Sequence, residues 1–279
     1  MTLKFFKSIM ISSLSSIYEM DELNSIFNLI VEDFLKISRS KILLADEISL
    51  NDETQALFLK TLERLRTHEP IQYILGKTNF MDLEFIVDSS VLIPRPETEE
   101  LVRLILKEDL YGKEILDIGT GSGCIAVSLA KNLPNSNVTA VDICKDAMEV
   151  AKENSKLNNV NIEFINADIF KFKSEKKYDL IVSNPPYVLK SDKKLMRENV
   201  LNFEPEIALF VDDNNPLKYY EKIIDFSKNH LKENGQIFFE INDKKSKDFK
   251  NILKLNNEHK SVFLLDSFKK TRFLKIQLF

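Results

Sequence analysis

Three closely spaced glycines constrain this chain more than any other feature of its sequence. The 279 residues include only six glycines, and Gly119, Gly121 and Gly123 are three of them. The apolar segment 115–118 before them is typical of a buried strand, and the segment from Cys124 onward is typical of a helix. Glycine lets the backbone turn tightly and brings bare amide groups close to a ligand. The pattern predicts a strand, a turn that binds a nucleotide-type ligand, and a helix; the alternative is a tight turn that binds nothing.

The spacing of the glycines indicates which ligand fits. In the dinucleotide fingerprint the third glycine comes three residues after the second, and here that position is Cys124. The loop also follows an aspartate, Asp117, and carries Thr120 and Ser122 between its glycines. The pattern Asp-x-Gly-x-Gly-x-Gly resembles the loop of S-adenosylmethionine-dependent methyltransferases, whose cofactor has no pyrophosphate. A nicotinamide-dependent dehydrogenase is therefore disfavoured.

Two acidic residues follow the next predicted strands. Asp142 lies 23 residues beyond Gly119, at the predicted end of the second strand, where a carboxylate can accept hydrogen bonds from both hydroxyls of a ribose. Asp168 follows the third predicted strand and is a candidate acceptor for an adenine amino group, with Ile169 packed on the ring. The alternatives are an exposed strand-end aspartate for Asp142 and an ordinary loop aspartate for Asp168.

The segment Ser183-Asn-Pro-Pro-Tyr follows the fourth predicted strand. Its prolines fix φ and remove two backbone donors, so that the side-chain oxygen of Asn184 and the carbonyl of Pro185 form a stiff pair of acceptors. A planar NH₂ group could donate one hydrogen to each, and Tyr187, after Pro186, could lie over that group as a wall. Holding both hydrogens favours a pyramidal nitrogen and aims its lone pair along the S–CH₃ axis of a sulfonium. The alternative is a rigid turn without a chemical role.

The hydrophobic pattern divides the chain into three parts. Residues 1–76 have helical spacing over 3–18, 26–37 and 56–65, with capping residues at 51–54, and predict a small helical bundle. Residues 77–94 predict a linker with a β-hairpin at Phe80–Val91, around Asp88-Ser-Ser. Residues 95–279 alternate between predicted strands (114–118, 137–141, 162–165, 180–183, 236–241 and 261–265) and predicted helices (97–107, 124–132, 145–157, 217–232 and 245–255). This alternation predicts an α/β fold with a mostly parallel sheet covered by helices on both faces.

Composition and charge exclude several classes of protein. Hydrophobic residues make up 44% of the chain and charged residues 29%, which excludes wholesale disorder. The net charge of −4 argues against a protein that grips long nucleic acid mainly through charge. Two cysteines and three scattered histidines indicate neither a disulfide framework nor a metal site. The stretch 8–18 lacks the cleavage pattern of a signal peptide, and no apolar run is long enough to span a bilayer, so we expect a cytoplasmic protein.

Several motifs together resemble one family. The glycine loop and Asn184-Pro-Pro-Tyr occur with Glu69-Pro-Ile-Gln-Tyr-Ile-Leu-Gly, Leu92-Ile-Pro-Arg-Pro-Glu-Thr-Glu and Phe203-Glu-Pro-Glu-Ile-Ala-Leu. With these motifs the chain resembles, nearly end to end, the peptide chain release factor glutamine methyltransferases, the PrmC/HemK family. The resemblance implies a Rossmann-like class I S-adenosylmethionine-dependent methyltransferase domain, preceded by an all-α helical-bundle domain and the hairpin linker.

The resemblance also implies a reaction and its residues. The substrate is the glutamine of the Gly-Gly-Gln motif in class 1 peptide chain release factors, methylated on its side-chain amide nitrogen (N5). S-adenosyl-L-methionine is the cofactor and S-adenosyl-L-homocysteine the product. The residues implied to contact the cofactor are Gly119, Thr120, Gly121, Ser122, Gly123, Asp142, Asp168, Ile169 and Asn184, and those implied to hold the glutamine are Asn184, Pro185, Pro186 and Tyr187. The helical domain would dock the release factor, and we expect a monomer that needs no metal, binds no membrane and binds no nucleic acid stably.

Three loops depart from the family pattern, and two other functions remain open. Glycines usual in the family are missing from the segment 210–216, from position 242, which is Asn242, and from the stretch between Asp266 and Arg272. One alternative is a methyltransferase acting on exocyclic amines of DNA or RNA, which should carry a basic groove, whereas this chain has only seven arginines. The other is a non-catalytic adaptor that has kept the fold, which would be free to lose Asn184 or the glycines.

Overall fold

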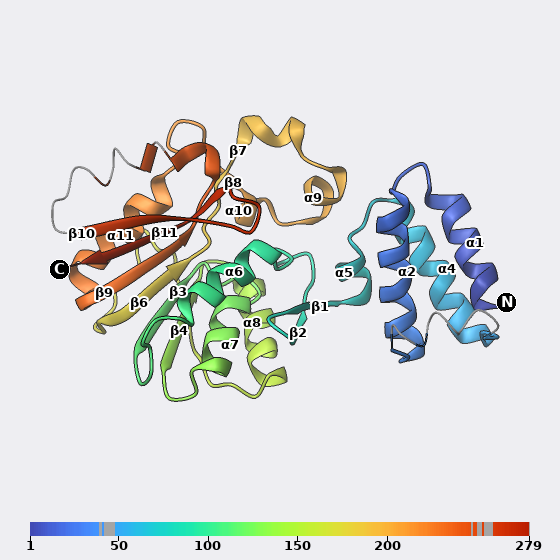
Figure 1. Cartoon of the computed structure of the whole chain (residues 1–279), viewed down its shortest axis with the longest axis horizontal. Helices are drawn as coiled ribbons and strands as arrows, with labels where there is room; N and C mark the ends of the chain where they lie inside the picture. Colours follow the sequence, from blue (N-terminus) through green and yellow to red (C-terminus); the bar gives the residue numbers. More distant parts are fainter. Residues whose placement is uncertain (39–40, 42–47, 247, 250–252, 254–258, 279) are drawn as a thin grey trace. The chain divides into compact units, whose positions relative to one another are not determined.

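The structure is a computed structural model that describes residues 1–38, 41, 48–246, 248–249, 253 and 259–278. Its contacts divide the chain into two units (Figure 1). The helical unit comprises Met1–Gly76 with Arg197–Phe203, and the sheet unit comprises Lys77–Met196 with Glu204–Phe279. Within the described residues, no helix is both long and apolar enough to cross a membrane.

The helical unit is built from amphipathic helices, as the spacing of its apolar residues predicts. They are α1 (Leu3–Leu14), α2 (Met20–Leu35) and α4 (Asp52–Arg66), and the unit also contains the short helices α5 (Ile71–Leu75) and α9 (Glu198–Phe203). Phe6, Phe27 and Phe58 are buried, and the rings of Phe6 and Phe58 meet edge to face with 4.3 Å between their centroids. Asn51 caps α4 by accepting a hydrogen bond from Thr54 N at 2.8 Å. The predicted helical character of this region is confirmed.

The hairpin at the start of the sheet unit turns earlier than predicted. β1 (Lys77–Phe80) pairs antiparallel with β2 (Leu83–Ile86), and the turn consists of Met81 and Asp82, with φ of 51° and 60°. Positive φ at both central residues matches the twist of a two-residue hairpin. The turn expected around Asp88-Ser-Ser is therefore wrong. Asp88 instead forms a local bend after the hairpin, where its Oδ1 accepts a hydrogen bond from Ser90 N at 2.8 Å.

The sheet unit contains a seven-stranded sheet with the order β10-β11-β9-β6-β3-β4-β5. The parallel strands are β3 (Glu114–Ile118), β4 (Asn137–Asp142), β5 (Glu163–Asn166), β6 (Tyr178–Ser183) and β9 (Leu231–Glu240). The strands β10 (His259–Leu265) and β11 (Thr271–Leu278) pair antiparallel with each other, and β11 pairs antiparallel with β9. Two short strands, β7 (Val188–Leu189) and β8 (Phe210–Val211), pair separately. The predicted α/β fold with a mostly parallel sheet is confirmed.

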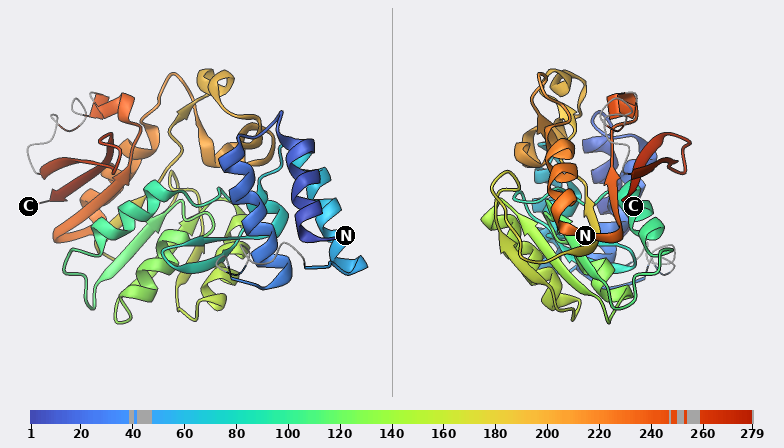
Figure 2. Two further views of the ribbon diagram at one scale, coloured as in Figure 1. Left: turned by 45° about the vertical axis from the view of Figure 1, so that its right-hand side comes forward. Right: turned by 90° about the vertical axis from the view of Figure 1, so that its left-hand side faces the viewer.

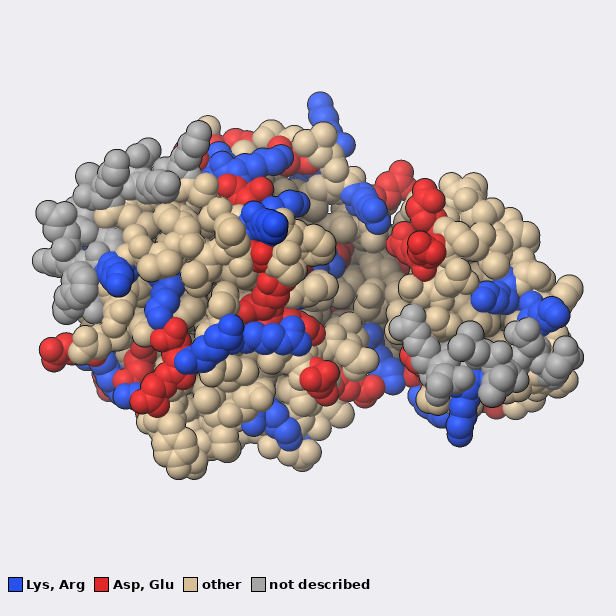
Figure 3. All heavy atoms as spheres, viewed as in Figure 1, with Lys and Arg blue, Asp and Glu red and all other residues tan. Residues whose placement is uncertain are grey.

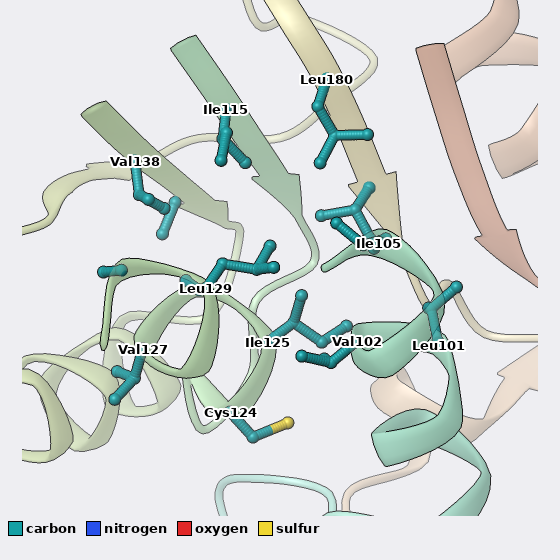
Figure 4. Packing of buried hydrophobic residues seen from close by; sticks show 14 of the residues in the cluster. Leu101, Val102, Ile105, Ile115, Cys124, Ile125, Val127, Leu129, Val138 and Leu180 are labelled. Carbon is teal, nitrogen blue, oxygen red and sulfur yellow. The ribbon is translucent and has the colours of Figure 1, made fainter. Parts of the chain in front are cut away.

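Helices cover both faces of this sheet (Figures 1 and 2). On one face, α6 (Pro96–Ile105) and α7 (Cys124–Asn132) pack side chains such as Ile105 and Leu129 against Ile115 of β3 (Figure 4), with α8 (Lys145–Leu157) beside α7. On the other face, α11 (Lys218–His230) packs Tyr220 edge to face on Phe239 of β9, and Leu116 of β3 belongs to the same cluster. Neighbouring residues of β3 thus face opposite clusters, because side chains alternate along a strand.

Three predictions for the sheet unit need comment. The strand β11 was not predicted, because the expected alternation of strands and helices has no place for an antiparallel strand at the end of the chain. The helix predicted over 217–232 ends at His230, where β9 begins one residue later at Leu231. The helix predicted over 245–255 lies partly outside the described residues, which show a short 3₁₀ helix, η2 (Asp243–Lys245), at its start.

The order of the strands brings the two main motifs together. After β3 the chain runs outward to β4 and β5, and then returns to β6 on the other side of β3. The connections that follow β3 and β6 diverge, which leaves a crevice at the carboxyl ends of these strands. The glycine loop follows β3 and Asn184 follows β6, so both motifs lie at this crevice.

Candidate active site

A cavity of about 280 Å³ opens at the carboxyl ends of β3, β4 and β6. The cavity is lined by the glycine loop, by residues that follow β4, β5 and β6, and by part of the segment 90–98. Ile207 and Ala208 of α10 (Glu206–Leu209) also line it. A more open hollow of about 930 Å³ lies at the opposite ends of the strands, beside Glu114, Asn137 and Glu163. Ligands of doubly wound sheets bind at the carboxyl ends, so the 280 Å³ cavity is the candidate active site.

All three glycines of the loop adopt left-handed backbone conformations. Their φ angles are 75° at Gly119, 54° at Gly121 and 78° at Gly123. A Cβ atom on Gly123 would lie 3.1 Å from the Cβ of Ala151, so this glycine also allows close packing of α7 on α8. The backbone N–H of Gly119 donates to Val141 O at 2.8 Å, which fixes the start of the loop at the end of β4. The loop needs glycine both for its turn and for its packing.

Asp142, the last residue of β4, holds the loop from the other side. Its Oδ2 accepts a hydrogen bond from Gly121 N at 2.8 Å, and its Oδ1 accepts one from Cys144 N at 2.8 Å. Burial raises the pKa of this carboxyl, and the backbone hydrogen bonds oppose part of the rise. Each carboxylate oxygen has two acceptor sites, so Asp142 can fix the loop and still accept from ribose hydroxyls. The sequence indicated only the second of these roles.

Thr120 and Ser122 line the cavity but are themselves buried. The hydroxyl of Thr120 donates to Asp117 Oδ2 at 2.6 Å, and the carbonyl of Ser122 accepts from Asn154 Nδ2 at 2.9 Å. Asp117 is fully buried beneath the loop, and burial raises its pKa to about 7, against the opposing effect of the Thr120 hydrogen bond. The hydroxyl of Thr120 therefore stabilises the loop from within.

The charges around the cavity suit a cationic ligand. Among the described residues that line it, the charged ones are Arg95, Asp142 and Asp168. Arg95 pairs with the buried Glu204 at 2.6 Å, so the surroundings carry a net negative charge. A sulfonium that also bears an ammonium group fits this environment, whereas a pyrophosphate does not. No group of three His, Cys, Asp or Glu residues within the described ranges could hold a metal ion.

Asp168 and Ile169 line the cavity after β5. The Oδ1 atom of Asp168 accepts a hydrogen bond from Phe170 N at 2.9 Å, and Ile169 is buried. Ile143, directly after Asp142, lines the same part of the cavity and is 52% exposed. An exposed isoleucine in a cavity offers an apolar surface to a flat ring. The sequence analysis missed Ile143, although its place beside the strand-end aspartate was a usable signal.

Asn184, Pro185 and Pro186 line the cavity directly after β6. The Nδ2 of Asn184 donates to Thr98 Oγ1 at 3.3 Å. Tyr187 is not among the residues that line the cavity; its ring packs on the apolar cluster under α11, and its hydroxyl donates to Glu240 Oε1 at 3.1 Å. The structure therefore brings the first three residues of the motif to the cavity and gives Tyr187 a supporting position.

Two residues that the sequence analysis did not single out connect to Asn184. Thr98 lies in the first turn of α6 and donates to Glu240 Oε2 at 2.7 Å, and Glu240 is the last residue of β9. Both are buried. Burial raises the pKa of Glu240, and hydrogen bonds from Thr98 and Tyr187 oppose the rise. A charge directly after the apolar segment 237–239 was a signal for Glu240, and Thr98 lies within the motif 92–99, although nothing local in the sequence indicated its role.

Several known proteins are similar to this chain. The methyltransferase small domain family matches residues 97–203, and the PrmC N-terminal domain family matches residues 11–76. The chain is 42% identical to a release factor glutamine methyltransferase of Flavobacterium psychrophilum over 99% of each chain. It is 40% identical to one of Bacteroides thetaiotaomicron over 94% of this chain and 95% of the other. A solved methyltransferase of Pyrococcus furiosus shares the fold, with a TM-score of 0.52 and 20% identity over 82% of this chain and 98% of the other. The chain belongs to the family of release factor glutamine methyltransferases.

Proposed function

We propose that this protein transfers a methyl group from S-adenosyl-L-methionine to the side-chain amide nitrogen (N5) of the glutamine in the Gly-Gly-Gln motif of class 1 peptide chain release factors. One observation carries the proposal: the glycine loop and the acceptors of Asn184 and Pro185 line the same cavity. Family membership supports it, because the relatives are named for this reaction.

The cofactor would be held by the acidic side of the cavity. Residues 119–122 of the loop and Asp142 line this side of the cavity, where the Asp142 carboxylate would accept from the ribose hydroxyls and Asp168 and Ile169 would contact the adenine. When bound, the cofactor supplies an electrophilic methyl group on a positively charged sulfur. The net negative charge of the lining stabilises a cation there before the reaction.

Asn184 and Pro185 would hold the glutamine. An amide nitrogen is a poor nucleophile because its lone pair is delocalised. The side-chain oxygen of Asn184 and the carbonyl of Pro185 each accept one hydrogen of the NH₂ group, which favours a pyramidal nitrogen with its lone pair directed at the methyl group. Orientation of this kind contributes several kcal/mol, up to roughly 7–11 in the best intramolecular models. As the bond between this nitrogen and the methyl carbon forms, the S–CH₃ bond of the cofactor would break with its electron pair going to sulfur, which leaves S-adenosyl-L-homocysteine, and the nitrogen would release one proton to water.

The partner is proposed to bind through the helical region. We propose residues 1–76 as the domain that docks the release factor, 77–94 as the hairpin linker and 95–279 as the methyltransferase domain. The protein would act as a monomer in the cytoplasm, where its substrate takes part in translation termination. An acidic chain with a net charge of −4 suits a protein partner better than long nucleic acid.

A methyltransferase acting on exocyclic amines of DNA or RNA is the alternative, because Asn184 and Pro185 would hold such an amine in the same way. On the face of the sheet unit shown in Figure 3, Lys and Arg side chains are interspersed with Asp and Glu and do not form a basic band. Retention of bulk DNA or RNA in a filter-binding titration at physiological salt would favour this alternative. The persistence of Asn184 and the three glycines disfavours a non-catalytic adaptor.

The test uses cofactor labelled in its methyl group. The protein is incubated with a class 1 release factor and with the same factor carrying alanine in place of the Gly-Gly-Gln glutamine, and mass spectrometry locates the label. We expect the label on that glutamine and none on the altered factor. Label elsewhere, or on nucleic acid alone, would overturn the proposal.

A further inference from the structure

Three buried or half-buried side chains form a continuous hydrogen-bonded chain that ends in the cavity. It starts at the carboxylate of Glu240, passes through the hydroxyl of Thr98 at 2.7 Å, and reaches the amide of Asn184 at 3.3 Å. These residues come from β9, α6 and the loop after β6, three separate parts of the sheet unit. Their side chains meet only because the sheet order places β9 next to β6 and α6 packs against β9.

The hydrogen bonds that link Asn184, Thr98 and Glu240 all donate in one direction, toward Glu240. The Thr98 hydroxyl donates its single proton to Glu240 Oε2 at 2.7 Å. The Thr98 oxygen then has only lone pairs for its second neighbour and must accept from the NH₂ group of Asn184. The other end of the amide, the Oδ1 atom, is thereby left as the acceptor that Asn184 offers to a ligand. An asparagine alone has no such preference, because a rotation of about 180° exchanges its oxygen and nitrogen.

We propose that Thr98 and Glu240 are positioning residues that fix the amide of Asn184 with its oxygen toward the acceptor group, so that the site selects a ligand that donates an NH₂ group. The inference deepens the proposed function and rests on it. With the amide reversed, Asn184 would present its own NH₂ to the NH₂ of glutamine, and neither group could accept. The reversed amide would suit a carboxylate instead.

The surroundings of Glu240 favour its acceptor role. Tyr187 donates to Oε1 of the carboxylate at 3.1 Å, and the Tyr220 hydroxyl donates to the main-chain carbonyl of Glu240 at 3.0 Å. Arg272 on the adjacent strand β11 attracts the carboxylate, whereas Glu97 repels it. Burial raises the pKa of this carboxyl, and the hydrogen bonds from Thr98 and Tyr187 together with the Arg272 guanidinium oppose that rise.

The main test compares Thr98→Val with Thr98→Ser in the full-length protein. Valine keeps the shape but removes the hydroxyl, whereas serine keeps the hydroxyl. We expect Thr98→Val to lower kcat about 10- to 100-fold, with the KM for the release factor and the Kd for the cofactor changed by less than about threefold. Thr98→Ser should restore kcat to within about threefold of the unaltered protein.

A binding measurement distinguishes a change in the orientation of the Asn184 amide from a general loss of structure. A release factor with glutamate in place of the Gly-Gly-Gln glutamine should bind the unaltered protein at least about tenfold more weakly than the normal factor, because its carboxylate faces the Asn184 oxygen. In Thr98→Val the amide can turn, and this difference should shrink to about threefold or less. Glu240→Gln should act in the same way, because its new NH₂ group donates to Thr98 and turns the hydroxyl toward Asn184.

Thr139 provides a matched control. Its buried hydroxyl donates to a glutamate, Glu163, at 2.9 Å, but on β4 and away from the cavity. Thr139→Val should leave kcat and the preference for glutamine over glutamate unchanged. If Thr98→Val and Glu240→Gln fold and keep both the unaltered kcat and that preference, the inference is wrong. Failure of the unaltered protein to methylate any release factor would instead overturn the proposed function.

Discussion

The two halves of the cavity are assembled in different ways. In the cofactor half (Gly119–Gly123, Asp142, Asp168 and Ile169), the hydrogen bonds that shape the site join residues at most 32 positions apart. In the acceptor half (Asn184–Pro186 with Thr98 and Glu240), the bonds join residues 86 and 142 positions apart. The cofactor half is therefore encoded locally, whereas the acceptor half depends on the completed fold. The two halves should respond differently to substitution.

The largest effect is expected from Asn184→Ala, in the acceptor half. Removing this acceptor should lower kcat for methylation of a release factor by about 10²–10³-fold, the usual cost of losing one oriented hydrogen-bonding group in an active site. Thermal unfolding and the Kd for the cofactor should change little, since the loop 119–123 and Asp142 stay in place. Asn161→Ala, at an exposed position outside the cavity, is the control. Unchanged turnover in Asn184→Ala would contradict the role given to this half.

This contrast matches what could be predicted from the sequence. The glycine loop, Asp142 and the Asn-Pro-Pro segment could be predicted because each is recognised by residue types and spacing within a short stretch of sequence. The strands β3 to β6 could be predicted from runs of apolar residues. The roles of Thr98 and Glu240 could not be predicted, although Thr98 lies within the motif 92–99, because these roles depend on a contact between α6 and β9 that no short window contains. The strand β11 was missed for a similar reason: its place between β9 and β10 is set by pairing across the sheet.

A second effect concerns the buried carboxyl under the cofactor half. The pKa of Asp117 is raised from 3.8 to about 7, so its contribution to stability is complete below pH 3.8 and is lost as the pH rises through 7. Asp117→Asn removes the titration but keeps an oxygen that accepts from Thr120. Between pH 5 and 8, the free energy of unfolding of the variant should rise relative to that of the unaltered protein by roughly 2–3 kcal/mol.

Urea unfolding of both proteins at pH 5 and pH 8, without cofactor, measures this difference. Other groups titrate equally in the two proteins, so the comparison isolates Asp117. A constant difference across this range would mean that the carboxyl titrates at an ordinary pKa. In that case burial of Asp117 beneath the loop would not raise the pKa of its carboxyl.

A third prediction concerns the affinity for the cofactor, which should depend on the cofactor half of the cavity. Asp142→Ala removes the acceptor of the Gly121 and Cys144 amides and of the ribose hydroxyls, so the Kd for S-adenosyl-L-methionine should rise about 10- to 100-fold in calorimetry. Asp146→Ala, which removes the same charge from an exposed position of α8, should leave the Kd within about twofold. Equal affinity in Asp142→Ala would reassign this aspartate to a purely structural role.

The smallest effect is expected when single glycines of the loop are replaced by alanine. The resulting loss in the free energy of unfolding tests whether the loop needs these glycines only for their backbone conformation. At Gly121 an added Cβ would meet no atom within 4 Å, so Gly121→Ala should cost only the left-handed conformation, about 1 kcal/mol of the free energy of unfolding. At Gly123 the same Cβ would lie 3.1 Å from the Cβ of Ala151, so Gly123→Ala adds crowding between α7 and α8, and the total should reach about 2–3 kcal/mol. In a double-mutant cycle with Ala151→Gly, Gly123→Ala should destabilise the protein less when position 151 is glycine, because the crowded Cβ atom is then absent. Equal destabilisation by the two alanines would show that packing on α8 places no demand on the loop, and that its glycines serve only the turn and the ligand.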